Sequence, residues 1–144
     1  MFTIIIPTLN NLNYLKFSIE SIKKTSTLNN EILVHVSEDK NSLTREYLSK
    51  QNIKYTHSDD NVGLCTAINT IAKKASNKYL IYSHDDMYFC PDWEAPLMQE
   101  INKLNHNNFY ISGSMIEPNS GHIQFNCGEN LETFNEKMLL ENLK

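Results

Sequence analysis

The sequence predicts an α/β fold in which a mostly parallel sheet is covered by helices on both faces. Short apolar runs, typical of buried strands, alternate with segments whose apolar residues recur every three to four positions. Parallel strands need crossover connections, and the helical segments supply them. At 144 residues the chain is long enough for one core and too short for two ordinary domains, so we expect a single domain over residues 1–144.

The first strand–helix pair is the clearest. A buried strand is expected at residues 2–6, ending at Pro7, because five apolar or β-branched residues stand in a row there. Asn10 or Asn11 can cap the following helix, since a side-chain oxygen there can accept from the free amides of the first turn. The apolar residues at helical spacing are Leu12, Leu15, Ile19 and Ile22.

The same alternation continues along the chain. Further strands are expected at residues 31–36, 53–57, 78–83 and 109–112, and further helices at 43–50, at 64–75 and from Pro91 to about Leu104. Four strand–helix alternations with short loops are typical of an open, doubly covered sheet.

Composition excludes several classes of protein. The net charge is −4, and the twelve lysines are scattered beside a single arginine, Arg45, so a surface that tracks nucleic-acid phosphates is not expected. No apolar run approaches the roughly 20 residues that a membrane span needs. The three cysteines are odd in number and far apart, which predicts free thiols in a reducing cytoplasm.

Polar and acidic residues follow each of the first four expected strands. These segments are 7–10, 37–39, 59–61 and 84–86. Because the carboxyl ends of parallel strands meet at one edge of a sheet, and sites on such sheets lie beyond that edge, we expect these side chains to converge.

The converging residues permit a specific chemistry. Asp85 and Asp86 follow an apolar strand, where a carboxylate pair can hold Mg²⁺ or Mn²⁺ that takes its other ligands from phosphate and water. Such an ion favours diphosphate as a leaving group. The alternative is that both residues only start a turn. Likewise, residues 61–63 can present helix-terminal amides to an anion or act as a plain cap.

Together these segments resemble the family 2 glycosyltransferases, inverting enzymes of the GT-A fold, over residues 2 to about 115. Pro7-Thr8-Leu9-Asn10 is similar to the family's Pro-Thr-x-Asn loop, which implies that Pro7, Thr8 and Asn10 neighbour the base and ribose of a nucleotide. Ser37-Glu38-Asp39 stands where the family places an acidic stretch that contacts a uracil-type base. The resemblance implies that role for Glu38 or Asp39.

Two further segments carry the resemblance. Asn61-Val62-Gly63, with Ala67 and Asn69 downstream, is similar to the family's Asn-x-Gly and Ala-x-Asn pattern, which implies that Asn61, Gly63 and Asn69 lie on the nucleotide side. Residues 82–86 look like the family's aspartate motif in an x-Asp-Asp form. By that resemblance Asp85 faces the ribose and Asp86 binds the metal, Mn²⁺ or Mg²⁺.

The resemblance implies metal-assisted transfer of a sugar from a nucleotide-diphosphate donor, with UDP-sugars favoured by family frequency, to an unknown glycan, lipid or protein acceptor. Residues 1–115 would form the nucleotide-sugar-binding part. Residues 116–144 would begin a short or incomplete acceptor side, with the fold truncated at its C-terminal side. The catalytic base is unknown, and the available carboxylates are Glu117, Glu129 and Glu132.

Three other interpretations compete. A noncatalytic nucleotide-sugar-binding module would keep the donor half and lack the acceptor half and the base. A phospho-receiver domain would need acidic residues after the first strand, where Pro7-Thr8 stands. A sugar nucleotidyltransferase would need a glycine-rich basic loop near the start, but the first glycine is Gly63.

Overall fold

The structure is a computed structural model that describes residues 1–143. Contacts within the chain divide it into two compact units, residues 1–94 and the remainder from Ala95 onward. The first unit carries a four-stranded sheet and the second carries a two-stranded sheet. The expected α/β class is confirmed by the first unit.

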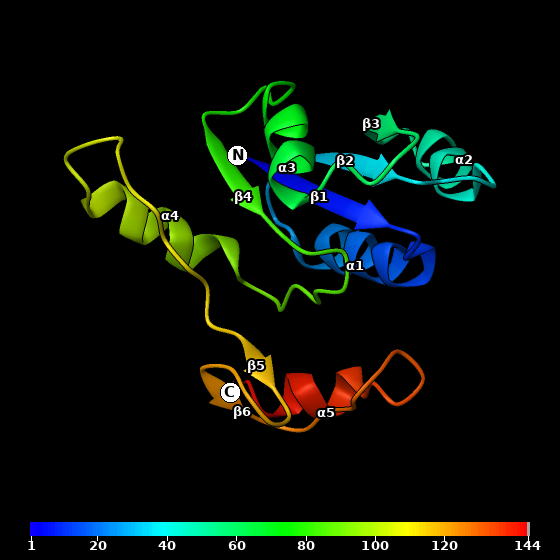
Figure 1. Cartoon of the computed structure of the whole chain (residues 1–144). Helices are drawn as coiled ribbons and strands as arrows, with labels where there is room; N and C mark the ends of the chain where they lie inside the picture. Colours follow the sequence, from blue (N-terminus) through cyan, green and yellow to red (C-terminus); the bar gives the residue numbers. More distant parts are fainter. Residues whose placement is uncertain (144) are drawn as a thin grey trace. The chain divides into compact units, whose positions relative to one another are not determined.

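The sheet of the first unit has four parallel strands. They are β1 (Phe2–Leu9), β2 (Glu31–Ser37), β3 (Lys54–Ser58) and β4 (Tyr79–Tyr82). Their order is β3-β2-β1-β4, as Figure 1 shows. The chain therefore moves outward from β1 to β3 and then returns to the other side of β1, so the strand order reverses between β1 and β4.

Helices cover both faces of this sheet, as expected. One core joins alternate residues of β1 and β2, such as Ile4 and Val34, to α1 (Leu12–Thr25) and α2 (Leu43–Lys50). The opposite faces of the same strands pack against α3 (Leu64–Ala72), which places Ile71 against Ile5 and Leu33. Both faces are thus buried, which explains why these strands are apolar at consecutive positions.

The sequence predicts that the first strand ends at Pro7, but in the structure it continues to Leu9. The carbonyl of Ile5 faces β4, because it accepts from Ser83 N–H at 3.1 Å. Backbone groups alternate sides along a strand, so the nitrogen of Pro7 faces the same side, where pairing with β4 has already ended at Ile5. The missing N–H of Pro7 therefore removes no hydrogen bond to β2.

The second unit departs further from expectation. No strand forms at residues 109–112, where Tyr110 is 88% exposed, so that expectation is wrong: a short apolar run becomes a strand only where a neighbour supplies hydrogen bonds. The elements observed are α4 (Glu94–Lys103), β5 (Ile116–Glu117), β6 (Ile123–Gln124) and α5 (Glu136–Glu141). Within residues 1–143, none of the helices combines the length and apolar character needed to cross a membrane.

A half-buried carboxylate, that of Glu31, connects the amino ends of the strands. Glu31 accepts hydrogen bonds from the Thr3 hydroxyl at 2.7 Å, from the Ser76 backbone N–H at 2.9 Å and from Lys54 Nζ at 3.1 Å. Burial raises the pKa of Glu31, but these hydrogen bonds outweigh it and lower the pKa from 4.5 to about 2. The ionised carboxylate therefore stabilises the junction of β1, β2 and β3 with the chain that leads into β4.

Replacement of Glu31 by Gln tests this role. The amide keeps one acceptor oxygen but turns its NH₂ group toward donors, so we expect a loss of about 2 kcal/mol in the free energy of unfolding at pH 7. Urea unfolding followed by tryptophan fluorescence measures it. Trp93 is the only tryptophan and packs between the rings of Phe2 and Phe89, so its emission reports the first unit.

The pH dependence provides the control. The folded pKa of about 2 lies below the ordinary value of 4.5, so the contribution of Glu31 is complete above pH 4.5 and disappears as the pH falls toward 2. The difference between the wild type and Glu31→Gln should shrink over that range. Glu20→Gln, on the exposed side of α1, should show no comparable difference at any pH. Equal losses for both variants would contradict the role given to Glu31.

Candidate functional site

The candidate site lies at the carboxyl edge of the parallel sheet. All four strands run in the same direction, so the segments that follow them leave from that one edge. The segments after β1 and β4 are neighbours at the point where the strand order reverses, and ligands of open α/β sheets bind in the crevice at such a point. The geometry therefore supports the convergence that the sequence predicts.

The segments after β1 and β4 meet through Asp85. Its carboxylate accepts from the Thr8 hydroxyl at 2.5 Å and from Asn11 Nδ2 at 3.1 Å. Thr8 is buried, Asp85 is half-buried, and Asp86 beside it is exposed. The two aspartates therefore differ: Asp85 is held in place by β1 and the start of α1, whereas the carboxylate of Asp86 faces solvent.

His84 contacts its neighbours in the sequence, Tyr82 and Ser83. Its Nε2 lies 2.9 Å from the hydroxyl of Tyr82, and the two rings pack with their centroids 5.1 Å apart. The hydroxyl of Ser83 donates to the His84 carbonyl at 2.9 Å. These contacts fix the direction in which the chain leaves β4, which places the aspartates that follow.

The ends of β1 and β2 adopt uncommon backbone conformations. Asn10 and Glu38 follow these strands directly, with φ of +52° and +55°. Asn tolerates the left-handed region, but for Glu it is unfavourable, and such conformations are concentrated at functional sites. The Glu38 N–H donates to the Ser58 carbonyl at 3.1 Å, which joins the segment that follows β2 to the end of β3.

Asp39 is buried, and its carboxylate is engaged with α2. It accepts from the backbone N–H of Arg45 at 3.0 Å, from Arg45 Nε at 3.2 Å and from the Thr44 N–H at 3.4 Å. Burial raises the pKa of Asp39, but the hydrogen bonds and the charge of Arg45 outweigh it and lower the pKa. The only arginine of the chain is thus paired within the fold, and of the two acids Glu38 is the more exposed.

The segment before α3 forms a compact turn. Asn61 Oδ1 accepts from the Gly63 N–H at 2.9 Å, and Gly63 caps α3 with φ of +77°. A residue with a side chain would be strained at that φ. Asn61 and Gly63 therefore lie at the carboxyl edge, with the Gly63 amide already engaged, while Asn69 lies exposed on α3 itself.

The structure also reveals contacts that the sequence did not signal as functional. Asn11 was expected only as a helix cap, yet its side chain binds Asp85 and makes no capping hydrogen bond. Buried His35 and half-buried Ser58 form part of a hydrogen-bond network behind the turn at residues 59–63. The only signal for this network is a histidine within an otherwise apolar strand.

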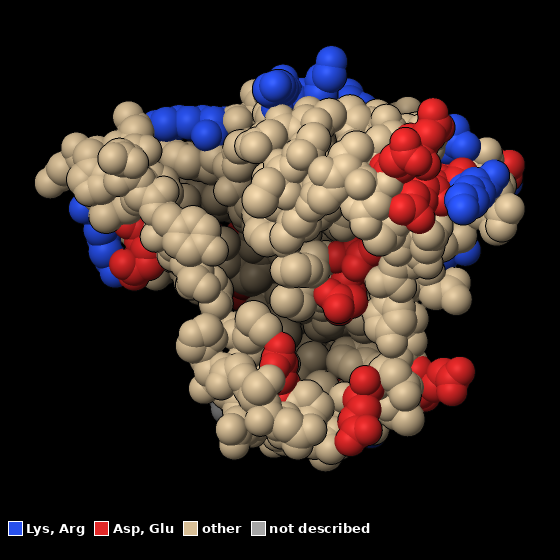
Figure 2. Space-filling model, in the orientation of Figure 1, with Lys and Arg blue, Asp and Glu red and all other residues tan. Residues whose placement is uncertain are grey.

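Negative charge is concentrated at the carboxyl edge. The acidic residues in its segments are Glu38, Asp39, Asp59, Asp60, Asp85 and Asp86. Among residues 1–143, no cluster of three metal-ligating side chains exists. On the face in Figure 2, Lys and Arg side chains form separate groups with no continuous basic band.

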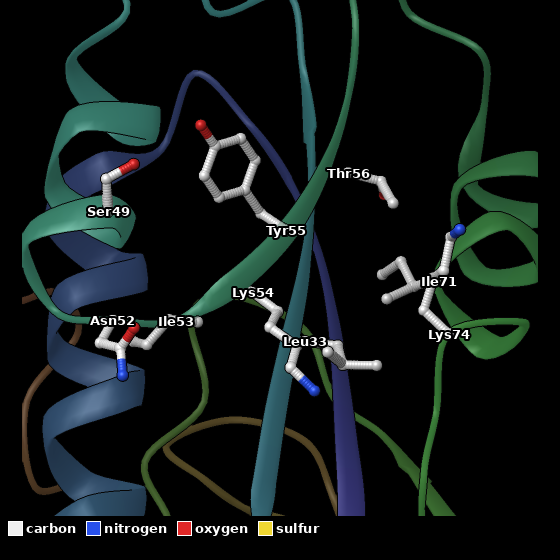
Figure 3. Close-up of a pocket in the computed structure, with 9 residues that line it drawn as sticks. All are labelled: Leu33, Ser49, Asn52, Ile53, Lys54, Tyr55, Thr56, Ile71 and Lys74. Atoms are coloured by element: carbon white, nitrogen blue, oxygen red, sulfur yellow. The ribbon is translucent and has the colours of Figure 1, made fainter.

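A groove of about 450 Å³ lies elsewhere, along the outer side of β3. Figure 3 shows β3 between α2 and α3, with Tyr55 directed toward α2 and Thr56 toward α3. Leu33 and Ile71 contribute apolar surface, and no carboxylate lines the groove. It therefore lacks the groups that the candidate chemistry requires, and the carboxyl edge remains the candidate site.

Comparison with known sequences identifies relatives. The sequence model of Glycosyl transferase family 2 matches residues 3–141. An uncharacterized glycosyltransferase of Rickettsia bellii (strain RML369-C) is 33% identical over 115 residues, which are 77% of this chain and 16% of that protein. This chain therefore spans about one sixth of the length of that relative.

Solved structures share the fold. S. aureus TarS 1–349 in complex with UDP has a TM-score of 0.62 at 17% identity, over 79% of this chain and 38% of that one. Its complex with UDP-GlcNAc has a TM-score of 0.60 at 20% identity, over 79% and 37%. The mannosyltransferase PcManGT of Pyrobaculum calidifontis, in complex with GDP-Man and Mn²⁺, has a TM-score of 0.55 at 17% identity, over 61% and 28%.

A double-mutant cycle tests the contact between Thr8 and Asp85. We expect Thr8→Val and Asp85→Ala to be coupled by about 1–2 kcal/mol in the free energy of unfolding, because either change alone removes the same charged hydrogen bond. Urea unfolding monitored by Trp93 measures all four proteins. The matched cycle of Thr8→Val with Asp86→Ala should give a coupling below about 0.5 kcal/mol. Similar couplings in both cycles would refute the distinction between the two aspartates.

Proposed function

This chain belongs to glycosyl transferase family 2. We propose that a nucleotide-diphosphate sugar binds at its carboxyl edge and that the protein transfers the sugar to an acceptor. The observation that carries the proposal is the hydrogen bond between Thr8 and Asp85, with exposed Asp86 beside it, where the strand order reverses. UDP is the proposed nucleotide, and the UDP and UDP-GlcNAc complexes of the structurally similar TarS support it.

The proposed nucleoside contacts follow from the segments at the edge. Pro7, Thr8 and Asn10 would border the base and ribose, with Glu38 or Asp39 contacting the base. Asp85 would accept from ribose hydroxyls, because its carboxylate has about four lone-pair positions and the hydrogen bonds from Thr8 and Asn11 occupy only part of them. Asn61, Gly63 and Asn69 complete the proposed nucleotide side.

A divalent cation, Mn²⁺ or Mg²⁺, is part of the proposal. A diphosphate cannot approach the acidic carboxyl edge without compensating positive charge, and Arg45, the only arginine, is already bound to Asp39. Asp86 is the proposed protein ligand, since it is exposed and an oxygen donor suits a hard cation. When bound, the cation stabilises the charge that develops on the departing diphosphate. The Mn²⁺ in the PcManGT structure agrees with this choice.

The general base on the acceptor side is not assigned to a residue. Inverting transfer needs a general base to take the proton of the acceptor hydroxyl. Glu117 accepts from the Ser120 hydroxyl, and Glu129 and Glu132 are exposed, so none is distinguished as that base. A second candidate function is donor binding without transfer. It is favoured because none of these three carboxylates is distinguished as a base.

We also propose that the protein acts in the cytoplasm. Within residues 1–143, Cys65, Cys90 and Cys127 form no disulfide, as expected where thiols stay reduced. The proposed acceptor is a glycan, a lipid or a protein, and no nucleic-acid partner is proposed, because the net charge is −4.

Asp86→Ala tests the metal role. Calorimetric titration of the wild type with UDP should show tighter binding with Mn²⁺ than with EDTA. In Asp86→Ala we expect the affinity for UDP in Mn²⁺ to fall at least about tenfold and the benefit of Mn²⁺ to disappear, because the ion loses its protein ligand. Folding should be unchanged, since an exposed side chain contributes little packing.

Two further measurements complete the test. Glu46→Ala, an exposed acidic residue on α2, is the matched control and should bind UDP as the wild type does. An unchanged response to Mn²⁺ in Asp86→Ala would contradict the metal assignment. Release of UDP from UDP-GlcNAc, measured with candidate acceptors, separates the two candidate functions, since donor binding without release of UDP supports the second.

A further inference from the structure

A histidine and three hydroxyl side chains form a polar cluster inside the sheet. We call His35, Ser37, Thr56 and Ser58 the histidine–hydroxyl cluster, in which the Ser37 hydroxyl lies 3.4 Å from that of Ser58. His35 is only 2% exposed and stands between Val34 and Val36, whose exposures are 0% and 1%. Its Nδ1 lies 2.8 Å from the Thr56 hydroxyl and its Nε2 lies 3.2 Å from the Ser58 hydroxyl. A buried imidazole is costly unless both nitrogens find partners, and β3 supplies both.

The partners determine the tautomer of the ring. The hydroxyl of Ser58 lies 2.8 Å from the carbonyl oxygen of Asp60, which can only accept, and 3.4 Å from the Ser37 hydroxyl, which can also donate, so Ser58 donates its single proton to Asp60. His35 Nε2 must therefore carry a hydrogen and donate it to Ser58. In the neutral ring Nδ1 is then an acceptor, and the Thr56 hydroxyl donates to it.

The hydrogen bonds of Ser58 extend from the sheet into the turn that precedes α3. The carbonyl of Asp60 belongs to that turn, in which Asn61 Oδ1 accepts from the Gly63 N–H. The carbonyl of Ser58 also accepts from the Glu38 N–H at 3.1 Å. One serine thus joins the buried histidine to two of the segments that form the carboxyl edge.

We propose that His35 is a positioning residue for the nucleotide site: its Nε2–H orients the Ser58 hydroxyl, which fixes the Asp60 carbonyl and with it the backbone of Asn61–Gly63. This inference rests on the proposed function, because Asn61 and Gly63 are the proposed nucleotide contacts. His35 itself touches no nucleotide. It acts through Ser58, and Thr56 only completes the hydrogen bonding of the ring.

The electrostatic environment keeps the ring in the required form. Burial, together with the charge of His57, lowers the pKa of His35 below its ordinary value of 6.5. The ring is therefore neutral at pH 7, and the single-donor tautomer persists. A protonated ring would carry a hydrogen on Nδ1 as well, and the Thr56 hydroxyl would have to turn around to accept it.

Two conservative substitutions of His35 separate positioning from simple packing. The amide nitrogen of Gln reaches the place of Nε2 and can still donate to Ser58, whereas the shorter amide of Asn reaches only the place of Nδ1. We expect His35→Gln to keep the affinity for UDP with Mn²⁺ within about threefold of the wild type. His35→Asn should weaken it about tenfold, because the turn must then be ordered during binding.

A second pair changes the partners on β3. Ser58→Ala removes the link to Asp60 and should weaken UDP binding about tenfold, whereas Thr56→Val should leave it within about twofold. Urea unfolding monitored by Trp93 accompanies each titration, so that the loss of UDP affinity in each variant can be compared with its loss of stability. A structural role alone predicts that affinity follows stability in all four variants, and that result would overturn the proposal.

Hydrogen exchange keeps the inference separate from the proposed function. In the protein without nucleotide, the Gly63 amide bound to Asn61 should exchange at least about tenfold faster in Ser58→Ala and His35→Asn than in the wild type, Thr56→Val or His35→Gln. If the wild type fails to bind UDP, the proposed function is wrong. The exchange rates of the Gly63 amide still test whether His35 positions the turn. Equal exchange in all five proteins would refute the role of His35.

Discussion

The candidate site depends on one topological constraint, the return of β4 to the side of β1 that β2 leaves free. Because α3 crosses the face of the sheet opposite to α1 and α2, the chain after β4 emerges beside the end of β1. Asp85 then lies within hydrogen-bond distance of Thr8, 77 positions earlier in the chain. The hydrogen bonds fix one carboxylate, and its neighbour Asp86 stays exposed to solvent.

Much of the first unit could be predicted, because its two central strands, β1 and β2, are buried on both faces. Short runs of consecutive apolar residues, such as those of β1 and β2, favour a doubly buried strand, and the spacing of Leu15, Ile19 and Ile22 indicates α1 directly. The expectation that β1 ends at Pro7 was wrong because the nitrogen of Pro7 faces the side of β1 where pairing with β4 has already ended. The sequence alone does not show where β4 ends. The strand expected at residues 109–112 failed for a related reason, since four residues do not specify their own partner.

The site was less predictable than the fold. Because the strands are parallel, the sequence could predict that the loops after them leave from one edge of the sheet. The hydrogen-bond partner of each side chain depends instead on residues that are distant in the sequence. Asp39 illustrates this, because its local sequence does not show that Arg45 and the start of α2 engage it. The nucleotide and metal contacts stay predictions. The role of Asn11 required knowing that Asp85 lies above the start of α1.

The separation of Thr8 from Asp85 along the chain also bears on how the molecule folds. Pairing of β1 with β2 and of β2 with β3 closes loops of roughly 20 to 30 residues, whereas pairing of β1 with β4 brings together segments more than 70 residues apart. Loop closure becomes less probable as loops lengthen, and non-local contacts form later. We expect a nascent chain to acquire β1, β2 and β3 during synthesis and to lack the contact between Thr8 and Asp85 until β4 docks.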